Sequence, residues 1–199
     1  MTGGGAVAAY ARRAAEYADL LGSMEATAAP DRALVERWSA GVDGPLLDLG
    51  CGPGHWTAFL VGLGADAVGM DPVPEFVEIA RRSHPHVDYR LGDVSTPAPE
   101  GAWAGVLAWY SLIHLPPAAM PGALSRICAA MRPGGSVLLG FFDGERTEPF
   151  DHAVAPAWTW DIAELAAALE QAGLEIAHTE RRRDPGARPH GAVLARRPA

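Results

Sequence analysis

The nine residues from Leu46 to Gly54 constrain this 199-residue chain more than any other segment. They read LLDLGCGPG, so an apolar run ends in glycines at alternate positions, Gly50, Gly52 and Gly54. Glycine lets a backbone approach a ligand closely and adopt conformations that a Cβ would strain. Asp71 follows at the end of the next apolar run, where a carboxylate accepts hydrogen bonds from ribose hydroxyls. The spacing predicts a site for a ligand that carries a nucleoside.

Apolar runs alternate with helix-like segments along most of the chain. We expect strands at residues 46–49, 67–70, 87–91, 103–109, 136–142, 174–179 and 191–195. We expect helices at residues 6–22, 31–39, 55–63, 74–83, 118–131 and 161–172. Continuous apolar strands that alternate with helices predict an α/β fold, with a mostly parallel sheet and helices on both of its faces.

The length fits a single domain covering residues 1–199. Its predicted parts are an N-terminal helical cap at 1–44, a cofactor-binding core at 45–143, and a C-terminal helix and strands at 161–199. Residues 144–160 show no clear periodicity and contain Pro149, Pro156, Trp158 and Trp160. We expect an irregular loop there, and a long loop in a compact domain is often a lid over a site.

Ligand-binding groups are expected at one edge of this sheet. Residues 50–54, Asp71, Asp93 and residues 110–114 each follow a predicted strand. Because the carboxyl ends of parallel strands share one edge, these groups should converge. The spacing differs from the G-x-G-x-x-G of dinucleotide sites, since His55 takes the place of the third glycine. No arginine or lysine lies in the loop to hold a phosphate, so the site suits a ligand with ribose and adenine but little negative charge.

Five segments together resemble the class I methyltransferases that depend on S-adenosylmethionine. They are DLGCGPG at 48–54, GMD at 69–71, LGDV at 91–94, LAWYSLIH at 107–114 and MRPGG at 131–135. The resemblance is strong over residues 45–143, and the C-terminal strands are consistent with it. It implies a Rossmann-like seven-stranded sheet in the order 3-2-1-4-5-7-6, with the last strand antiparallel.

The resemblance also implies roles for the glycine loop. Gly50, Gly52 and Gly54 would wrap the methionine portion and the ribose of S-adenosyl-L-methionine. Asp48 would support the amino group of the cofactor. Cys51 lies within this loop, where a small residue is required, and we interpret it as a packing residue of the cofactor site and not as a nucleophile.

Further cofactor contacts are implied after the second, third and fourth strands. Asp71 would accept hydrogen bonds from both ribose hydroxyls, and Pro72 would lie against the adenine face. Asp93 would accept from the adenine amino group, and the Val94 amide would donate to the ring. The remaining implied contacts, to the methionine ammonium, are the backbone carbonyls of Tyr110 and Ser111.

The acceptor side is predicted at the end of the fourth strand and in the cap. Methyl transfer from a sulfonium is an in-line displacement, so a protein mainly positions the acceptor and excludes water. His114 is the candidate catalytic residue, as a general base, a positioning group or a structural histidine. Tyr10 and Tyr17 share a helix face, and three roles are open for them: to bracket the sulfonium, to form a wall of the substrate site, or to pack the helix on the sheet. We count Tyr17 with the cofactor site, and His152 is a weaker candidate base.

Composition narrows the classes of partner. A net charge of −8 disfavours nucleic acid. Basic side chains crowd the C-terminus, where they predict either a solvated edge or an anion-binding patch: Arg181, Arg182, Arg183, Arg188, Arg196 and Arg197. Two cysteines form no disulfide framework. His84 and His86 lack a third ligand, so we expect a turn and no metal site.

The same reasoning predicts location and assembly. No run of 18 apolar residues is present, so we expect no membrane span. The first residues lack the basic-then-apolar order of a secretion signal. We therefore expect a cytoplasmic monomer or homodimer.

These patterns predict transfer of a methyl group to oxygen or nitrogen of a small-molecule acceptor, most simply a specialised metabolite, with release of S-adenosyl-L-homocysteine. Two alternatives stay open, because a fold does not fix a reaction. In the first, the cofactor site serves other chemistry, such as a cyclisation. In the second, the chain is a non-catalytic partner subunit that retains the pocket.

Overall fold

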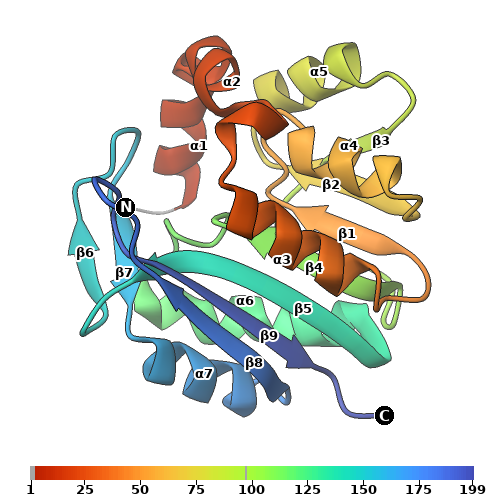
Figure 1. The fold of residues 1–199 in the computed structure, drawn as a ribbon, viewed down its shortest axis with the longest axis vertical. Coiled ribbons are helices and arrows are strands. Elements are labelled where there is room, and N and C mark those ends of the chain that lie inside the picture. Colours follow the sequence, from red (N-terminus) through yellow and green to blue (C-terminus); the bar gives the residue numbers. More distant parts are fainter. Residues whose placement is uncertain (1–2, 97) are drawn as a thin grey trace.

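The computed structural model describes residues 3–96 and 98–199. Its centre is a nine-stranded mixed sheet with helices on both faces (Figure 1). The strands are β1 (Leu46–Leu49), β2 (Ala67–Asp71), β3 (Asp88–Leu91), β4 (Trp103–Trp109), β5 (Met131–Asp143), β6 (Glu148–Phe150), β7 (Ala157–Trp160), β8 (Glu175–Arg182) and β9 (His190–Arg196). The α/β fold predicted from the alternation of apolar runs is confirmed.

Seven of these strands form the main sheet in the order β3-β2-β1-β4-β5-β9-β8. Strands β1 to β5 pair in parallel, for example Leu47 with Val68 and with Val106. Strand β9 runs antiparallel to both β5 and β8. In chain order of the seven strands this is 3-2-1-4-5-7-6 with the last strand antiparallel, which confirms the predicted order.

Residues 144–160 contain a feature that the sequence did not predict. They form an antiparallel hairpin of β6 and β7, not an irregular loop. Strand β7 also pairs in parallel with the end of β5, at Phe142 and Asp143. Pro149 argued against a strand in the sequence, because proline has no N–H to donate to a neighbouring strand and is tolerated in a sheet only at edge strands. Its position on β6, the last strand on its side of the sheet, agrees with that rule.

Alternate residues of the strands point to two different layers of helices. Helices α3 (Ala29–Ser39), α4 (His55–Gly62) and α5 (Pro74–Ser83) lie on one face, and α6 (Met120–Ala130) and α7 (Ile162–Gln171) on the other (Figure 1). Leu46 packs with α3 and α4, whereas its neighbour Leu47 packs in the cluster that includes α6 and α7. Burial on both faces explains why the strands are continuously apolar.

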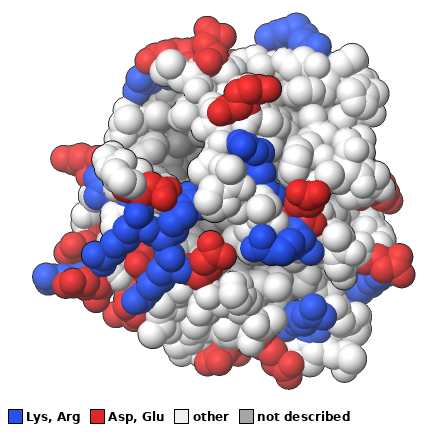
Figure 2. Space-filling model, in the orientation of Figure 1, with Lys and Arg blue, Asp and Glu red and all other residues white. Residues whose placement is uncertain are grey.

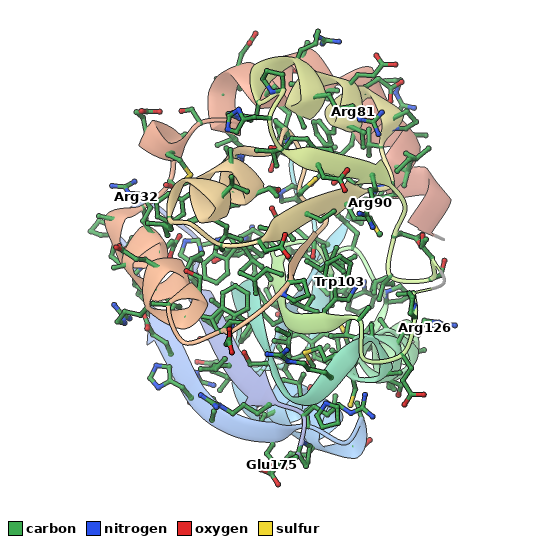
Figure 3. All side chains as sticks on the ribbon, turned by 90° about the vertical axis from the view of Figure 1, so that its right-hand side faces the viewer. Arg32, Arg81, Arg90, Trp103, Arg126 and Glu175 are labelled. Carbon is green, nitrogen blue, oxygen red and sulfur yellow. The ribbon has the colours of Figure 1, made fainter. Side chains whose placement is uncertain are left out.

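Two local interactions fix helices next to the site. The Asp161 carboxylate caps α7 by accepting from the amides of Ala163 and Glu164, at 2.8 and 3.2 Å. On the opposite layer, the Arg81 guanidinium of α5 donates to the carbonyl of Tyr89 in β3 at 2.6 Å (Figure 3). This bond holds α5 against the edge strand that precedes Asp93.

The short 3₁₀ turns are η1 (Met24–Ala26) and η2 (Pro117–Ala119).

The N-terminal segment differs from the single helix predicted at residues 6–22. It forms two helices, α1 (Gly3–Arg12) and α2 (Ala14–Leu21), which meet at Arg13. The Arg13 backbone lies outside the helical region, at φ −120° and ψ 15°. Its guanidinium bonds Glu16 and the carbonyl of Ala153, at the tip of the β6–β7 hairpin. The break between α1 and α2 therefore coincides with a hydrogen bond to a residue 140 positions further along the chain.

The C-terminal arginines mostly have partners in the fold. Arg182 pairs with Asp31 and Asp184, and its side chain is 16% exposed. Arg181 bridges Asp143 and Asp161, each at 3.3 Å. These contacts favour an internally paired edge over an open anion-binding patch. Figure 2 shows red side chains interspersed with the blue ones over this part of the surface.

Among the described residues, none of the helices is both long and apolar enough to cross a bilayer.

Candidate active site

The carboxyl ends of β1, β2 and β4 and the loop after β3 converge on a cavity of about 200 Å³. The predicted residues that line it are Tyr17, Gly50, Gly52, Asp71, Pro72, Asp93, Val94, Tyr110, Ser111 and His114. Val73, Phe76 and Trp109, which the sequence did not single out, also line it. Helices α1 and α2 cover this edge of the sheet (Figure 1).

A side chain at each of the three loop glycines would meet different surroundings. All have positive φ, at 75°, 55° and 90° for Gly50, Gly52 and Gly54. A Cβ on Gly50 would lie 2.2 Å from the Ser111 Cβ, so Gly50 lets β1 and β4 approach. A Cβ on Gly52 would meet nothing within 4 Å among the described atoms, so it would project into the space offered to a ligand. A Cβ on Gly54 would meet the Tyr89 ring at 2.7 Å.

Asp71 is buried and already organised for acceptance of hydrogen bonds. Its Oδ2 accepts from the Gly52 amide at 2.9 Å, and its Oδ1 accepts from the Val73 amide at 2.8 Å. Burial raises the pKa of Asp71 to about 6, although both amides oppose that rise. Each carboxylate oxygen has a second lone pair, so the group retains capacity for two further donors.

Two predicted cofactor residues lie behind the cavity wall. The buried Asp48 carboxylate accepts from the Thr57 hydroxyl at 2.7 Å, which ties β1 to α4, and burial raises its pKa to about 7. Asp48 and Gly54 line neither of the two cavities described in this section. Asp48 therefore lies beneath the glycine loop, and its predicted support of the cofactor's amino group stays a prediction. Cys51 lines the second cavity, described below, and burial raises its pKa, as expected of a packing thiol.

The turn after β4 is strained and offers a free polar atom. Tyr110 has φ +55°, a conformation that is unusual for a bulky residue and that clusters at functional sites. The next residue, Ser111, has a buried Oγ with no hydrogen-bond partner among the described residues. A buried hydroxyl without a partner is costly, and a ligand that supplies one removes the cost. With the open face of Gly52 and the ready Asp71, these residues fit an adenosyl cofactor with a polar tail.

His114 has a defined tautomer. Its Nδ1 lies 2.9 Å from the carbonyl of Pro156, which only accepts, so Nδ1 carries the hydrogen. Its Nε2 then accepts from the Tyr10 hydroxyl at 3.0 Å. Burial lowers the pKa of His114, so the ring is neutral at pH 7. The Tyr10 ring also contacts Tyr17 edge-on, with centroids 5.5 Å apart.

A second cavity of about 540 Å³ adjoins the first. The residues common to both are Tyr10, Tyr17, Gly50, Gly52, Trp109 and Tyr110. His152 lines the second cavity, and its ring centroid is 5.4 Å from that of His114. Figure 2 shows a recess in the upper left of the surface, in the region where α1 and α2 face the start of α3.

Sequence reasoning missed two histidines of the second cavity. His190 of β9 forms a hydrogen bond with the Tyr110 hydroxyl, and the distance from its Nδ1 to the hydroxyl oxygen is 2.5 Å. His55, at the start of α4, has a buried Nδ1 without a partner in the described part of the chain. His190 lies 80 residues from Tyr110, and no local pattern marks that pairing. The place of His55 directly after the glycine loop was the one available signal.

Metal ligation has no comparable support. Within residues 3–96 and 98–199, no group of three His, Cys, Asp or Glu side chains is placed to hold a metal ion.

Comparison with known proteins supplies a family and several relatives. A family model described as a methyltransferase domain matches residues 12–179. The ubiquinone biosynthesis O-methyltransferase of Xanthomonas axonopodis pv. citri (strain 306) is 34% identical over 155 residues, 66% of this chain and 62% of that protein. The trans-aconitate 2-methyltransferase of Methylobacterium radiotolerans is 35% identical over 121 residues, 59% of this chain and 46% of that protein. The chain thus spans less than two thirds of these relatives.

Solved structures are similar over more of the chain. The 1,6-didemethyltoxoflavin-N1-methyltransferase of Burkholderia thailandensis, with bound 1,6-didemethyltoxoflavin and S-adenosylhomocysteine, has a TM-score of 0.81 at 25% identity. The match covers 97% of this chain and 87% of that one. The cyclase SpnF has a TM-score of 0.69 at 20% identity and covers 85% of this chain and 81% of its own, a likeness that shows the fold alone.

Proposed function

Because the chain belongs to the class I S-adenosylmethionine-dependent methyltransferases, we propose that it methylates oxygen or nitrogen of a small-molecule specialised metabolite. The observation that carries this proposal is the junction of the two cavities. The first holds the residues that fit the cofactor, and the second adjoins it where Tyr10 meets His114. A donor and an acceptor can therefore lie side by side.

The cofactor supplies an already activated methyl group, so the protein's task is to bind, orient and exclude water. Gly50 and Gly52 shape the floor of its site, and Asp71 accepts from the ribose. Ser111 offers its unpartnered hydroxyl and the adjacent carbonyls to the methionine end. Helices α1 and α2 cover the site and restrict the entry of water.

His114 is the proposed general base. With Nδ1 fixed on the Pro156 carbonyl, its Nε2 presents a lone pair toward the cavity junction. An acceptor O–H or N–H that displaces the Tyr10 hydroxyl would donate to that lone pair. The bound cofactor would supply the methyl group and, once its sulfonium–methyl bond breaks, would leave as neutral S-adenosylhomocysteine. The proton of the acceptor would pass to Nε2, and His114 would become a cation. Before transfer, the displaced Tyr10 hydroxyl would be free to contact the acceptor, and its ring could face the sulfonium.

The β6–β7 hairpin is the proposed lid. Two hydrogen bonds attach it across the site: Arg13 to the Ala153 carbonyl at 2.6 Å, and the Trp158 amide to the Ile113 carbonyl at 2.9 Å. Since Pro156 in the same segment fixes the tautomer of His114, the lid position and the orientation of the base are linked. We propose that acceptor enters when the Arg13 contact opens.

The size of the second cavity supports a small acceptor. At about 540 Å³ it falls in the usual range for small-molecule sites. The names of the relatives cover both oxygen and nitrogen acceptors, a ubiquinone-pathway O-methyltransferase and a toxoflavin N1-methyltransferase. The proposal therefore includes both atoms.

The test combines cofactor binding with turnover. Calorimetric titration of S-adenosylmethionine should give binding to the wild type. A panel of hydroxylated aromatic and N–H heteroaromatic acceptors should then release one S-adenosylhomocysteine per methylated product. Product without loss of cofactor would favour a cyclisation. No cofactor binding by the folded protein, or binding with no release across the panel, would contradict the proposal.

His114→Asn tests the base separately. The shorter amide retains a donor for the Pro156 carbonyl but offers no basic nitrogen at the junction. We expect kcat to fall by roughly 10²–10⁴ with cofactor affinity unchanged. His86→Asn, at an exposed position remote from both cavities, is the matched control. Equal kcat for the two variants would exclude His114 as the base.

A further inference from the structure

The charged side chains that line the second cavity are all internally paired. They are two arginines and three carboxylates: Arg13, Arg182, Glu16, Asp31 and Asp184. Arg13 bonds Glu16 at 2.8 Å, and Arg182 bonds both Asp31 and Asp184, the latter at 2.7 Å. The described wall therefore offers no unpaired cation to an acceptor, and its formal charge is negative.

The Arg182 pairing is not easily released for a ligand. The side chains of Arg182 and Asp31 are only 16% and 15% exposed. The two carboxylates raise the pKa of Arg182 above its usual range. Breaking such a pair leaves a poorly solvated charge without compensation, which is costly. An acceptor carboxylate would compete with two carboxylates that are already in place.

Much of the remaining wall is aromatic, and aliphatic residues such as Leu20, Ile113 and Val154 complete it. Tyr110 and Phe142 have ring centroids 5.1 Å apart, and Trp56 and Trp109 are 6.0 Å apart. Flat side chains of this kind favour stacking or edge contacts with a planar ring. These rings therefore favour a planar ligand that can lie against them.

Three imidazoles provide the polar contacts of this wall. Burial lowers the pKa of His55 and of His152 to about 4, and also lowers that of His190. Arg182 lowers the pKa of His190 further, while Asp31 and Asp184 oppose this. A neutral imidazole has one donor and one acceptor, which match ring N–H groups, ring nitrogens and carbonyls. The unpartnered Nδ1 of His55 is one such contact still available.

We propose, resting on the methyltransferase function above, that the acceptor is an uncharged planar aromatic compound with hydrogen-bonding groups on its edge, and that the Asp31–Arg182–Asp184 cluster excludes acceptors that carry a carboxylate. Trp109 and Tyr110 belong to both cavities, so the plane of the acceptor lies against the wall that continues from the cofactor site.

The test uses protein saturated with S-adenosylhomocysteine and a matched pair of probes, 2-quinolone and 2-quinolone-4-carboxylate. Calorimetry should show that the neutral probe binds at least tenfold more tightly than the carboxylate. Asp184→Asn removes one carboxylate at a partly exposed position and should reduce that ratio severalfold. Asp19→Asn changes the net charge equally at an exposed position of α2 and should leave the ratio unchanged.

Each contrary outcome has a distinct meaning. Equal binding of the two probes by the wild type would overturn the charge exclusion, and so would an equal ratio in the two variants. Binding of neither probe, with normal binding of S-adenosylhomocysteine, would overturn the planar aromatic class. Absence of S-adenosylhomocysteine binding would refute the proposed function itself.

Discussion

Replacing Asp71 with asparagine should weaken cofactor binding and change the stability of the cofactor-free protein only slightly at pH 7. Asparagine has nearly the same shape but no charge. Its single amide oxygen can accept from only one of the two amides, those of Gly52 and Val73, that now donate to the carboxylate. The substitution therefore removes a buried charge and one hydrogen bond together.

The two effects have similar magnitudes and opposite signs. A carboxylate with a pKa near 3.9 when unfolded and about 6 when folded lowers the free energy of unfolding by about 3 kcal/mol at pH 7. Losing one hydrogen bond to a charged group costs about 1.5–3 kcal/mol. We expect the free energies of unfolding of Asp71→Asn and the wild type to differ by less than about 2 kcal/mol at pH 7.

The pH dependence of the free energy of unfolding shows whether the Asp71 carboxylate is a buried charge. As pH rises from 4 to 6, the unfolded Asp71 ionises first, so the unfolded state binds fewer protons and the wild type loses stability. The variant lacks this titration. Relative to Asp71→Asn, the wild type should therefore be more stable at pH 4.5 than at pH 7. Urea unfolding of both proteins without cofactor measures this difference. Asp66→Asn, at the exposed position just before β2, is the control.

Cofactor affinity should respond independently. Without the carboxylate, the ribose hydroxyls lose a charged acceptor, and we expect at least a tenfold weaker Kd by calorimetry, about 1.4 kcal/mol. A stability difference that is constant with pH would refute the buried-charge reasoning. An unchanged Kd would remove Asp71 from the ribose site.

The remaining predictions concern the loop, a helix cap and the base. Gly50→Ala should lower Tm more than Gly52→Ala, because a Cβ at position 50 would clash with Ser111. In the same melting assay, Gly52→Ala should mainly abolish the increase in Tm that the cofactor causes in the wild type. Asp161→Ala should cost about 1 kcal/mol in urea unfolding, through loss of the α7 cap. Because burial lowers the pKa of His114, kcat should stay constant from pH 8 to about 6.5 and fall only below that value; a fall that begins above pH 7 would contradict this assignment.

The main sheet could be predicted because its signals are local. Strands β1, β2 and β4 and the middle of β5 are largely apolar, because they are buried on both faces, whereas the edge strand β3 buries only Tyr89. Two features could not be predicted because their causes are distant in sequence. The break at Arg13 accompanies a bond to Ala153, and β7 is stabilised by pairing with β5. Neither partner is visible in a local window.

The candidate site divides in the same way. Asp71, Asp93 and Ser111 follow strand ends, so topology alone places them at one edge. The positions of Asp48 and Gly54 required knowledge of what lies beneath the loop, namely Thr57 and the Tyr89 ring. A motif specifies a loop, but it does not distinguish the residues that face a ligand from those that support them.

The placement of β7 has a consequence for how acceptor preference can change. At Phe142, β5 pairs with β9 on one edge and with β7 on the other. Strand β4 pairs with that second edge only as far as Gly140, and β7 takes its place beyond that point. The peptide groups along this part of β5 are thus largely engaged within the sheet. The groups left to contact the proposed acceptor are therefore side chains, and substituting them should alter acceptor preference while the strand pairing is retained.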